Sequence, residues 1–149
     1  MNLPAHLGHL SRRFFSSLSR RPPERTDVAW ALAKLLPGEA TLWQQMPVQD
    51  RRHSIVVARR LTTLVEQPTR AELAGALLHD VGKLQSGLGT VSRVVATVVG
   101  SRTKRFRRYH DHEELGLEML RRAGSDAGTL AVIDGSGRAA RALRDADTV

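Results

Sequence analysis

The sequence predicts an all-α protein that folds as one compact helical bundle. Helix-type spacing of apolar residues recurs in nearly every segment, and residues typical of helix starts and ends stand at the segment borders. Residues 91–99 form the one β-branched, apolar run that could be a strand, and a strand there would have no partner strand. A chain of 149 residues is long enough for one domain with one core. We expect a basic, flexible N-terminal tail over residues 1–25 and a helical domain over residues 26–149.

The first helices of the domain are predicted to be short. Asp27 is expected to cap a helix that ends at Pro37-Gly38, since a side-chain oxygen satisfies free amides at a helix start and proline favours a break. A short helical turn around residues 42–44 is expected to follow, with Pro47 interrupting it.

The next helix is predicted from about Val48 to Glu66, with His53 in its first turns. Four apolar residues are expected to share its buried face, because they recur at roughly helical spacing. These residues are Ile55, Val56, Leu61 and Leu64.

The clearest helix start is Thr69-Arg70-Ala71-Glu72, which has the Thr-x-x-Glu pattern of a capping box. The helix that follows, Leu73 to about Val81, is apolar on all sides, as expected of a central helix. Gly82 favours a break after it, and residues 85–89 have the composition of a loop.

The C-terminal half is predicted as a series of helices with a basic loop. Residues 91–99 are interpreted as a buried helix that ends at Gly100, residues 101–108 as the loop, and residues 111–122 as a helix that Gly124 terminates. Ser125 or Asp126 is expected to cap a short helix to Ile133. Residues 134–137 form a predicted turn, and the last helix is predicted over residues 138–147.

Charge and composition limit the classes of partner and site. The formal net charge is +8, and residues 101–108 alone contain five basic and no acidic residues. Arg102–Arg108 therefore favours an anionic partner such as phosphate, nucleic acid or an acidic membrane surface, although a solvated face is the alternative. There is no cysteine, so any metal must be held by His, Asp, Glu or water. With no apolar stretch long enough for a transmembrane segment or secretion signal, we expect a cytoplasmic protein.

The motif with the most chemical information is Leu77-Leu78-His79-Asp80-Val81-Gly82-Lys83. An imidazole and a carboxylate side by side at the end of an apolar helix are costly to bury unless both are paired, and a divalent metal ion is the usual partner. His53 and Asp147 are potential further ligands upstream and downstream.

This motif, together with His53 and Asp147, resembles the signature of the HD-domain superfamily, an all-helical family of metal-dependent phosphohydrolases. The resemblance covers roughly residues 48–149. It implies a compact bundle of the HD-domain type and one divalent metal ion held by His53, His79, Asp80 and Asp147. Mn, Fe, Co, Ni, Zn and Mg all suit imidazole and carboxylate ligands. Asp147 matches the family's final Ala-Asp better than Asp145, which lies about 200° around the helix from it.

Three residues are candidates for catalytic roles. His112 is similar to the extra histidine of members with a larger metal site, and it is a candidate general acid or outer-shell hydrogen-bond partner; a solvated histidine is the alternative. A late histidine of such members is missing from residues 131–137, which favours one metal over two. Lys83 is a candidate phosphate contact, or alternatively a cation that stabilises the helix end. Asp80 is the third candidate catalytic residue.

The resemblance implies a hydrolase that cleaves a phosphoester of a nucleotide or another small phosphorylated compound through metal-activated water. A catalytically weak metal- and nucleotide-binding regulatory module is the second hypothesis. The third is an adaptor whose basic segments bind nucleic acid or membrane, with a metal that serves stability only.

Overall fold

The computed structural model describes residues 21–84 and 103–148, and it describes side chains within residues 21–84 and 113–148. This part of the chain contains helices and no strand, which confirms the predicted all-α class. None of its helices combines the length and apolar character that crossing a membrane requires. The helices are α2 (Arg25–Leu32), α3 (Pro37–Gln45), α4 (Val48–Leu64), α5 (Arg70–Leu78), α7 (Thr103–Arg122), α8 (Ala127–Asp134) and α9 (Ala140–Asp147).

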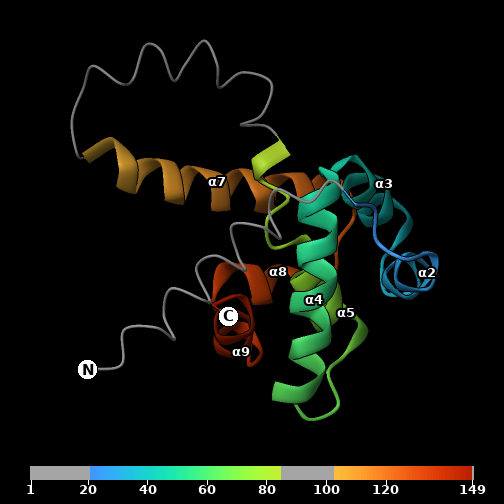
Figure 1. Ribbon diagram of the computed structural model, residues 1–149. Coiled ribbons are helices and arrows are strands. Elements are labelled where there is room, and N and C mark those ends of the chain that lie inside the picture. The colour runs from blue at the N-terminus through green and yellow to red at the C-terminus, as the bar shows by residue number, and fades with distance from the viewer. Residues whose placement is uncertain (1–20, 85–102, 149) are drawn as a thin grey trace, which may run out of the picture.

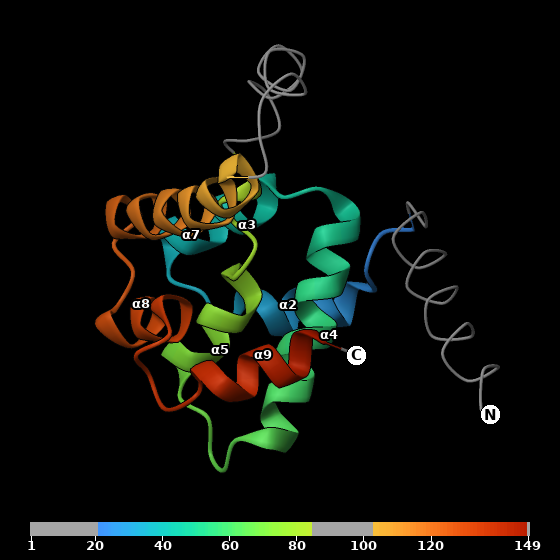
Figure 2. The same ribbon diagram turned by 90° about the vertical axis from the view of Figure 1, so that its left-hand side faces the viewer.

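The centre of the bundle is α5, which packs between α4 and α8, while α9 packs along α4 (Figure 1). Its residues from Glu72 to Leu78 are all buried, as predicted for a central helix. The approach of α5 to α8 is close at Gly75, where a Cβ atom would lie 2.8 Å from the Cβ of Val132. Glycine is therefore required for this packing distance. Figure 2 shows α7 lying across one end of the bundle, above α3 and α8.

The capping box that starts α5 is present as predicted. Thr69 Oγ1 accepts a hydrogen bond from the Glu72 amide, and Glu72 Oε2 accepts one from the Thr69 amide at 2.8 Å. Glu72 also accepts two hydrogen bonds from Arg138, from Nε at 2.7 Å and from Nη2 at 2.9 Å. This bidentate pair connects the start of α5 to the segment that leads into α9.

Several predicted helix borders are wrong in the first half of the domain. The cap of α2 is Glu24, and Asp27 lies in its first turn, where it forms an ion pair with Arg59 of α4 at 2.7 Å. Pro37 begins α3 instead of ending a helix, because its missing amide needs no partner in a first turn. The end of α5 is Leu78, three residues before the predicted Val81, and turns with i to i+3 hydrogen bonds follow.

Helix α4 begins at Val48 as predicted and ends at Leu64, two residues before the predicted Glu66, and the prediction of its buried face is only partly correct. The side chains of Val56 and Leu64 are about half exposed, at 47% and 52%. Val57 and Ala58 are fully buried in their place, beside Ile55 and Leu61. The bundle therefore covers a face of α4 rotated away from the one that the apolar spacing indicated.

In the C-terminal half, α7 begins at Thr103, so the predicted loop over residues 101–108 is wrong for residues 103–108. Gly124 and Gly135 end α7 and α8 as predicted, with positive φ angles of 81° and 87°. Asp126 occupies the N-cap position of α8, but its side chain makes no capping hydrogen bond, and α9 begins at Ala140, two residues after the predicted start. Residues 1–20 of the tail predicted over residues 1–25, and the predictions for residues 85–102, lie outside the described residues. Arg25, the last residue of the predicted tail, already belongs to α2.

Candidate metal centre

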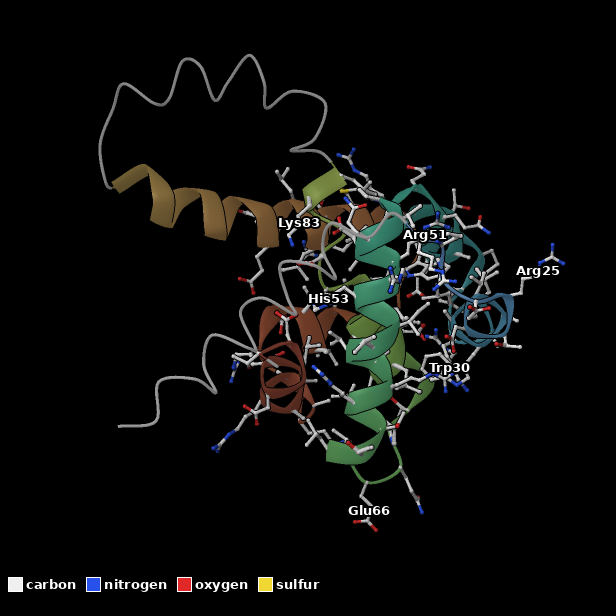
Figure 3. All side chains as sticks on the ribbon, viewed as in Figure 1. Arg25, Trp30, Arg51, His53, Glu66 and Lys83 are labelled. Atoms are coloured by element: carbon white, nitrogen blue, oxygen red, sulfur yellow. The ribbon has the colours of Figure 1, made fainter. Side chains whose placement is uncertain are left out.

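The first residue of the candidate site is His53, on the face of α4 that α9 covers. Its Nε2 atom lies 2.7 Å from Asp147 Oδ1. This hydrogen bond joins two residues that are 94 positions apart in the sequence. Figure 3 shows His53 and Lys83 on one side of the α4 ribbon and Arg51 and Trp30 on the other. Packing fixes this orientation, because Trp43 is fully buried against α4 and its Nε1 donates to Ser54 Oγ at 3.0 Å.

The second residue, His79, is the C-cap of α5. Its Nδ1 lies 2.8 Å from the Ala76 carbonyl oxygen, which can only accept, so Nδ1 carries a proton and donates. Its Nε2 is buried and lies 3.4 Å from Asp147 Oδ1 and 3.5 Å from Asp80 Oδ2, without a hydrogen bond of good geometry to either. The ring is thus held so that Nε2 faces two carboxylates.

The third residue, Asp147, ends α9, and contacts to α4 hold this helix in position. Ala146 is buried, and its carbonyl oxygen accepts a hydrogen bond from Arg60 Nη1 at 3.2 Å. Asp145 is exposed on another side of α9. The orientation of α9 therefore turns Asp147, and not Asp145, toward the two histidines.

One ligand atom each of His53, His79 and Asp147 lies within 4.8 Å of the other two, as three ligands of one ion require. The hydrogen bond with His53 and the nearby imidazole of His79 hold the pKa of the Asp147 carboxyl far below its usual range. Burial disfavours protonation of His79, but Asp147, Asp80 and the Ala76 carbonyl outweigh it and raise the pKa of this imidazole. Both pKa shifts are in the direction that favours positive charge beside His79 and Asp147.

A divalent cation fits this arrangement. A neutral His79 would direct the Nε2 lone pair at two carboxylate oxygens, which is unfavourable in a buried position. A cation accepts that lone pair and neutralises the carboxylates, and the Nδ1 bond to a backbone carbonyl is the usual support of a metal-binding histidine. Imidazole nitrogen and carboxylate oxygen are ligands for the divalent ions named above.

Asp80 lies beside these three residues but is paired with a different group. Its Oδ2 atom accepts a hydrogen bond from Lys83 Nζ at 2.8 Å. Burial opposes the charge on Lys83, yet Asp80 raises the pKa of its ammonium. The structure brings three of the four predicted ligands together and leaves the fourth, Asp80, at the edge of the cluster, where Lys83 holds it.

The residues of α7 with predicted roles are ones whose side chains the structure does not describe. His112 belongs to α7, but its side chain lies outside the described residues. The same holds for the basic side chains of residues 103–108, and Arg102 lies outside altogether. Four residues after His112, Gly116 contacts the turn that follows His79, where its Cβ would lie 3.3 Å from the Gly82 amide nitrogen.

Asp50 is a further residue of the site that was not predicted from the sequence. Burial raises the pKa of this carboxyl, and Lys83, Asp80, His53 and His79 all act on it electrostatically. The signal was present, since Asp50 precedes His53 by three residues and residues at that spacing share a helix face.

A cavity of about 490 Å³ lies beside the cluster, between the end of α5, the end of α8 and α9. His79, Asp80, Lys83 and Asp147 form part of its wall. Its volume is within the range of small-molecule sites.

Comparison with known proteins gives one match. A model of the HD domain family matches residues 51–145, which is nearly two thirds of the chain. The match includes His53, His79 and Asp80 and ends two residues before Asp147. No curated protein and no solved structure matches the chain.

Proposed function

The chain belongs to the HD domain family, and we propose that it is a metal-dependent phosphohydrolase that cleaves a phosphoester of a nucleotide or another small phosphorylated compound. The observation that carries the proposal is the His53, His79 and Asp147 cluster, with a buried and unpartnered Nε2 atom beside a cavity of ligand size.

We propose that His53 Nε2, His79 Nε2 and Asp147 Oδ1 hold one divalent ion, with an Asp80 oxygen as the fourth ligand. The proximity of Asp80 to His79, 3.5 Å between Oδ2 and Nε2, supports its inclusion. A divalent cation bound there lowers the pKa of a water molecule toward neutrality and offsets charge on the phosphoryl oxygens.

The other residues of the site orient these groups and supply charge. The Ala76 carbonyl holds the His79 ring in one tautomer, so that Nε2 stays available. Lys83 holds Asp80 through the 2.8 Å contact and adds positive charge to the cavity wall. The positive charge of Lys83 favours an anionic substrate over a neutral one.

We propose His112 as the general acid that donates a proton to the leaving oxygen. Two observations support this position: Glu113, the next residue in α7, lines the cavity, and Gly116, one helical turn later, contacts the turn after His79. A histidine is suited to proton transfer near neutral pH because its ordinary pKa is about 6.5.

An activity screen tests the proposed function. The purified protein is incubated with nucleoside mono-, di- and triphosphates, cyclic nucleotides and dinucleotide polyphosphates, each with Mn, Co, Ni or Mg, and the products are separated by chromatography. We expect turnover of at least one compound, loss of turnover in excess chelator, and recovery when the metal is restored. His79→Ala is expected to reduce the rate by about 100-fold or more, because the metal loses a ligand, whereas Asp145→Asn, on the exposed side of α9, retains activity.

The regulatory alternative predicts a different result. If no compound turns over with any metal while nucleotides raise the melting temperature of the metal-loaded protein, the hydrolase proposal is contradicted and the binding module is supported.

A further inference from the structure

The cavity beside the metal cluster is lined by both charged and apolar residues. The charged or polar ones include His79, Asp80, Lys83 and Asp147. The apolar ones are Val132, Ile133, Ala140 and Leu143, which come from α8 and α9. A ligand with a charged end and an apolar or flat body matches such a site.

Within the described part of the chain, four carboxylates line the cavity, those of Asp80, Glu113, Asp134 and Asp147. A phosphate group enters such a space only if cations offset these negative charges. Among the residues whose side chains the structure describes, the lining offers two cations, Lys83 and Arg144.

Lys83 is engaged with the protein, through Asp80 at 2.8 Å. Arg144 is exposed, and within the described part of the chain its guanidinium makes no hydrogen bond or ion pair. It lies three residues before Asp147 in α9, a spacing that puts two side chains on the same helix face. Arg144 therefore presents a cation to the cavity from the helix that also supplies a metal ligand.

We propose that Arg144 binds the phosphate of the substrate and positions it against the metal site, while the rest of the substrate packs on the apolar residues Val132, Ile133 and Leu143. This inference rests on the proposed function. A guanidinium suits the role because its planar fork donates two parallel hydrogen bonds to phosphate oxygens. Lys83 then acts on Asp80 and not on the phosphate.

A purely structural role for Arg144 makes a different prediction. Arg144 lies in the last turn of α9, where any cation stabilises the helix dipole. In that case its removal lowers the melting temperature and leaves phosphate affinity unchanged. Arg141 is the matched control, since it is an exposed arginine on the same helix that does not line the cavity.

The test is calorimetric titration of inorganic phosphate into the Mn-loaded full chain, with metal content measured on each sample. We expect Arg144→Gln to weaken phosphate binding about 10-fold or more, because a charge-assisted contact is lost. Arg144→Lys is expected to weaken it less, since the charge remains without the fork. Arg141→Gln is expected to bind phosphate as the wild type does, and all variants are expected to retain the metal.

Three results would overturn the inference. If Arg144→Gln binds phosphate as tightly as Arg141→Gln, Arg144 does not contact the phosphate, and the proposed function stands. If Arg144→Gln loses metal together with phosphate, its role is support of the metal site. If the metal-loaded wild type does not bind phosphate, the inference and the proposed phosphohydrolase function fail together.

Discussion

At the scale of single residues, the adjacent His79 and Asp80 are the pair that the sequence predicted most clearly. Their position at the end of an apolar helix already required a charged partner. The tautomer of His79 could not be predicted, because the Ala76 carbonyl that fixes it is a backbone group made available by the end of α5 at Leu78. The choice of Asp147 over Asp145 depends on how α9 lies against α4, and only the family resemblance indicated it.

Glu72 provides a test at this scale away from the metal site. Its hydrogen bonds with Arg138 lower the pKa of the Glu72 carboxyl below the usual 4.5. The stabilisation by this charged pair is therefore complete above about pH 4.5 and is lost as the pH falls through the lower, folded-state value. We expect Glu72→Gln to lower the melting temperature at pH 7 and to reduce the difference in melting temperature between pH 7 and pH 3.

Glu118→Gln is the control for this experiment, since the Glu118 pair with Arg122 on α7 is exposed and contributes little to stability. The interpretation of the Glu72 pair is contradicted if Glu118→Gln and Glu72→Gln change the pH dependence of the melting temperature by the same amount. Calorimetry on the three proteins decides between these results.

At the scale of helices, the register of α4 is the feature on which the site depends most. The apolar spacing favoured a face with Val56 and Leu64, whereas the bundle buries Val57 and Ala58. Consecutive valines satisfy several helical patterns at once, so the spacing alone could not fix the rotation of the helix. The rotation matters for function because His53 lies one turn before Val57.

The two valines form a matched pair for testing this register. We expect Val57→Ala to reduce the free energy of unfolding by about 1–3 kcal/mol, because it removes buried methyl groups and leaves a cavity. Val56→Ala, at 47% exposure, is expected to change it by no more than about 0.5 kcal/mol. Urea denaturation measures both values, and an equal or larger loss for Val56→Ala would show that α4 presents its other face to the core.

The borders of helices were less predictable than their existence. Aspartate and proline are both common at the ends of helices. However, Asp27 contacts Arg59 of another helix, and Pro37 begins α3. The ion pair of Asp27 does not follow from local sequence, because its partner belongs to another helix. Proline is compatible with the first turn of a helix as well as with the end of one, so its residue type alone does not decide between the two. The capping box at Thr69 and Glu72 was predictable because both of its hydrogen bonds are local.

At the scale of the whole molecule, the candidate site depends on three helices that are distant in sequence. His53 comes from α4, His79 from the end of α5, and Asp147 from the end of α9. Two interactions between α4 and α9 hold the last ligand: the bond from Arg60 to the Ala146 carbonyl and the bond between His53 and Asp147. Formation of the site is thus coupled to folding of the bundle, and bound metal is expected to stabilise the whole domain.

Measurement of the metal content of Asp147→Asn and Asp145→Asn tests the central claim most directly. Both variants remove one carboxylate charge from α9 and differ only in which side of the helix changes. After expression with abundant metal and removal of loosely bound ions, we expect about one divalent ion per chain in the wild type and in Asp145→Asn. For Asp147→Asn we expect no stoichiometric metal and a melting temperature that chelator no longer lowers. A metal-free wild type, or equal metal content in the two variants, would contradict the account.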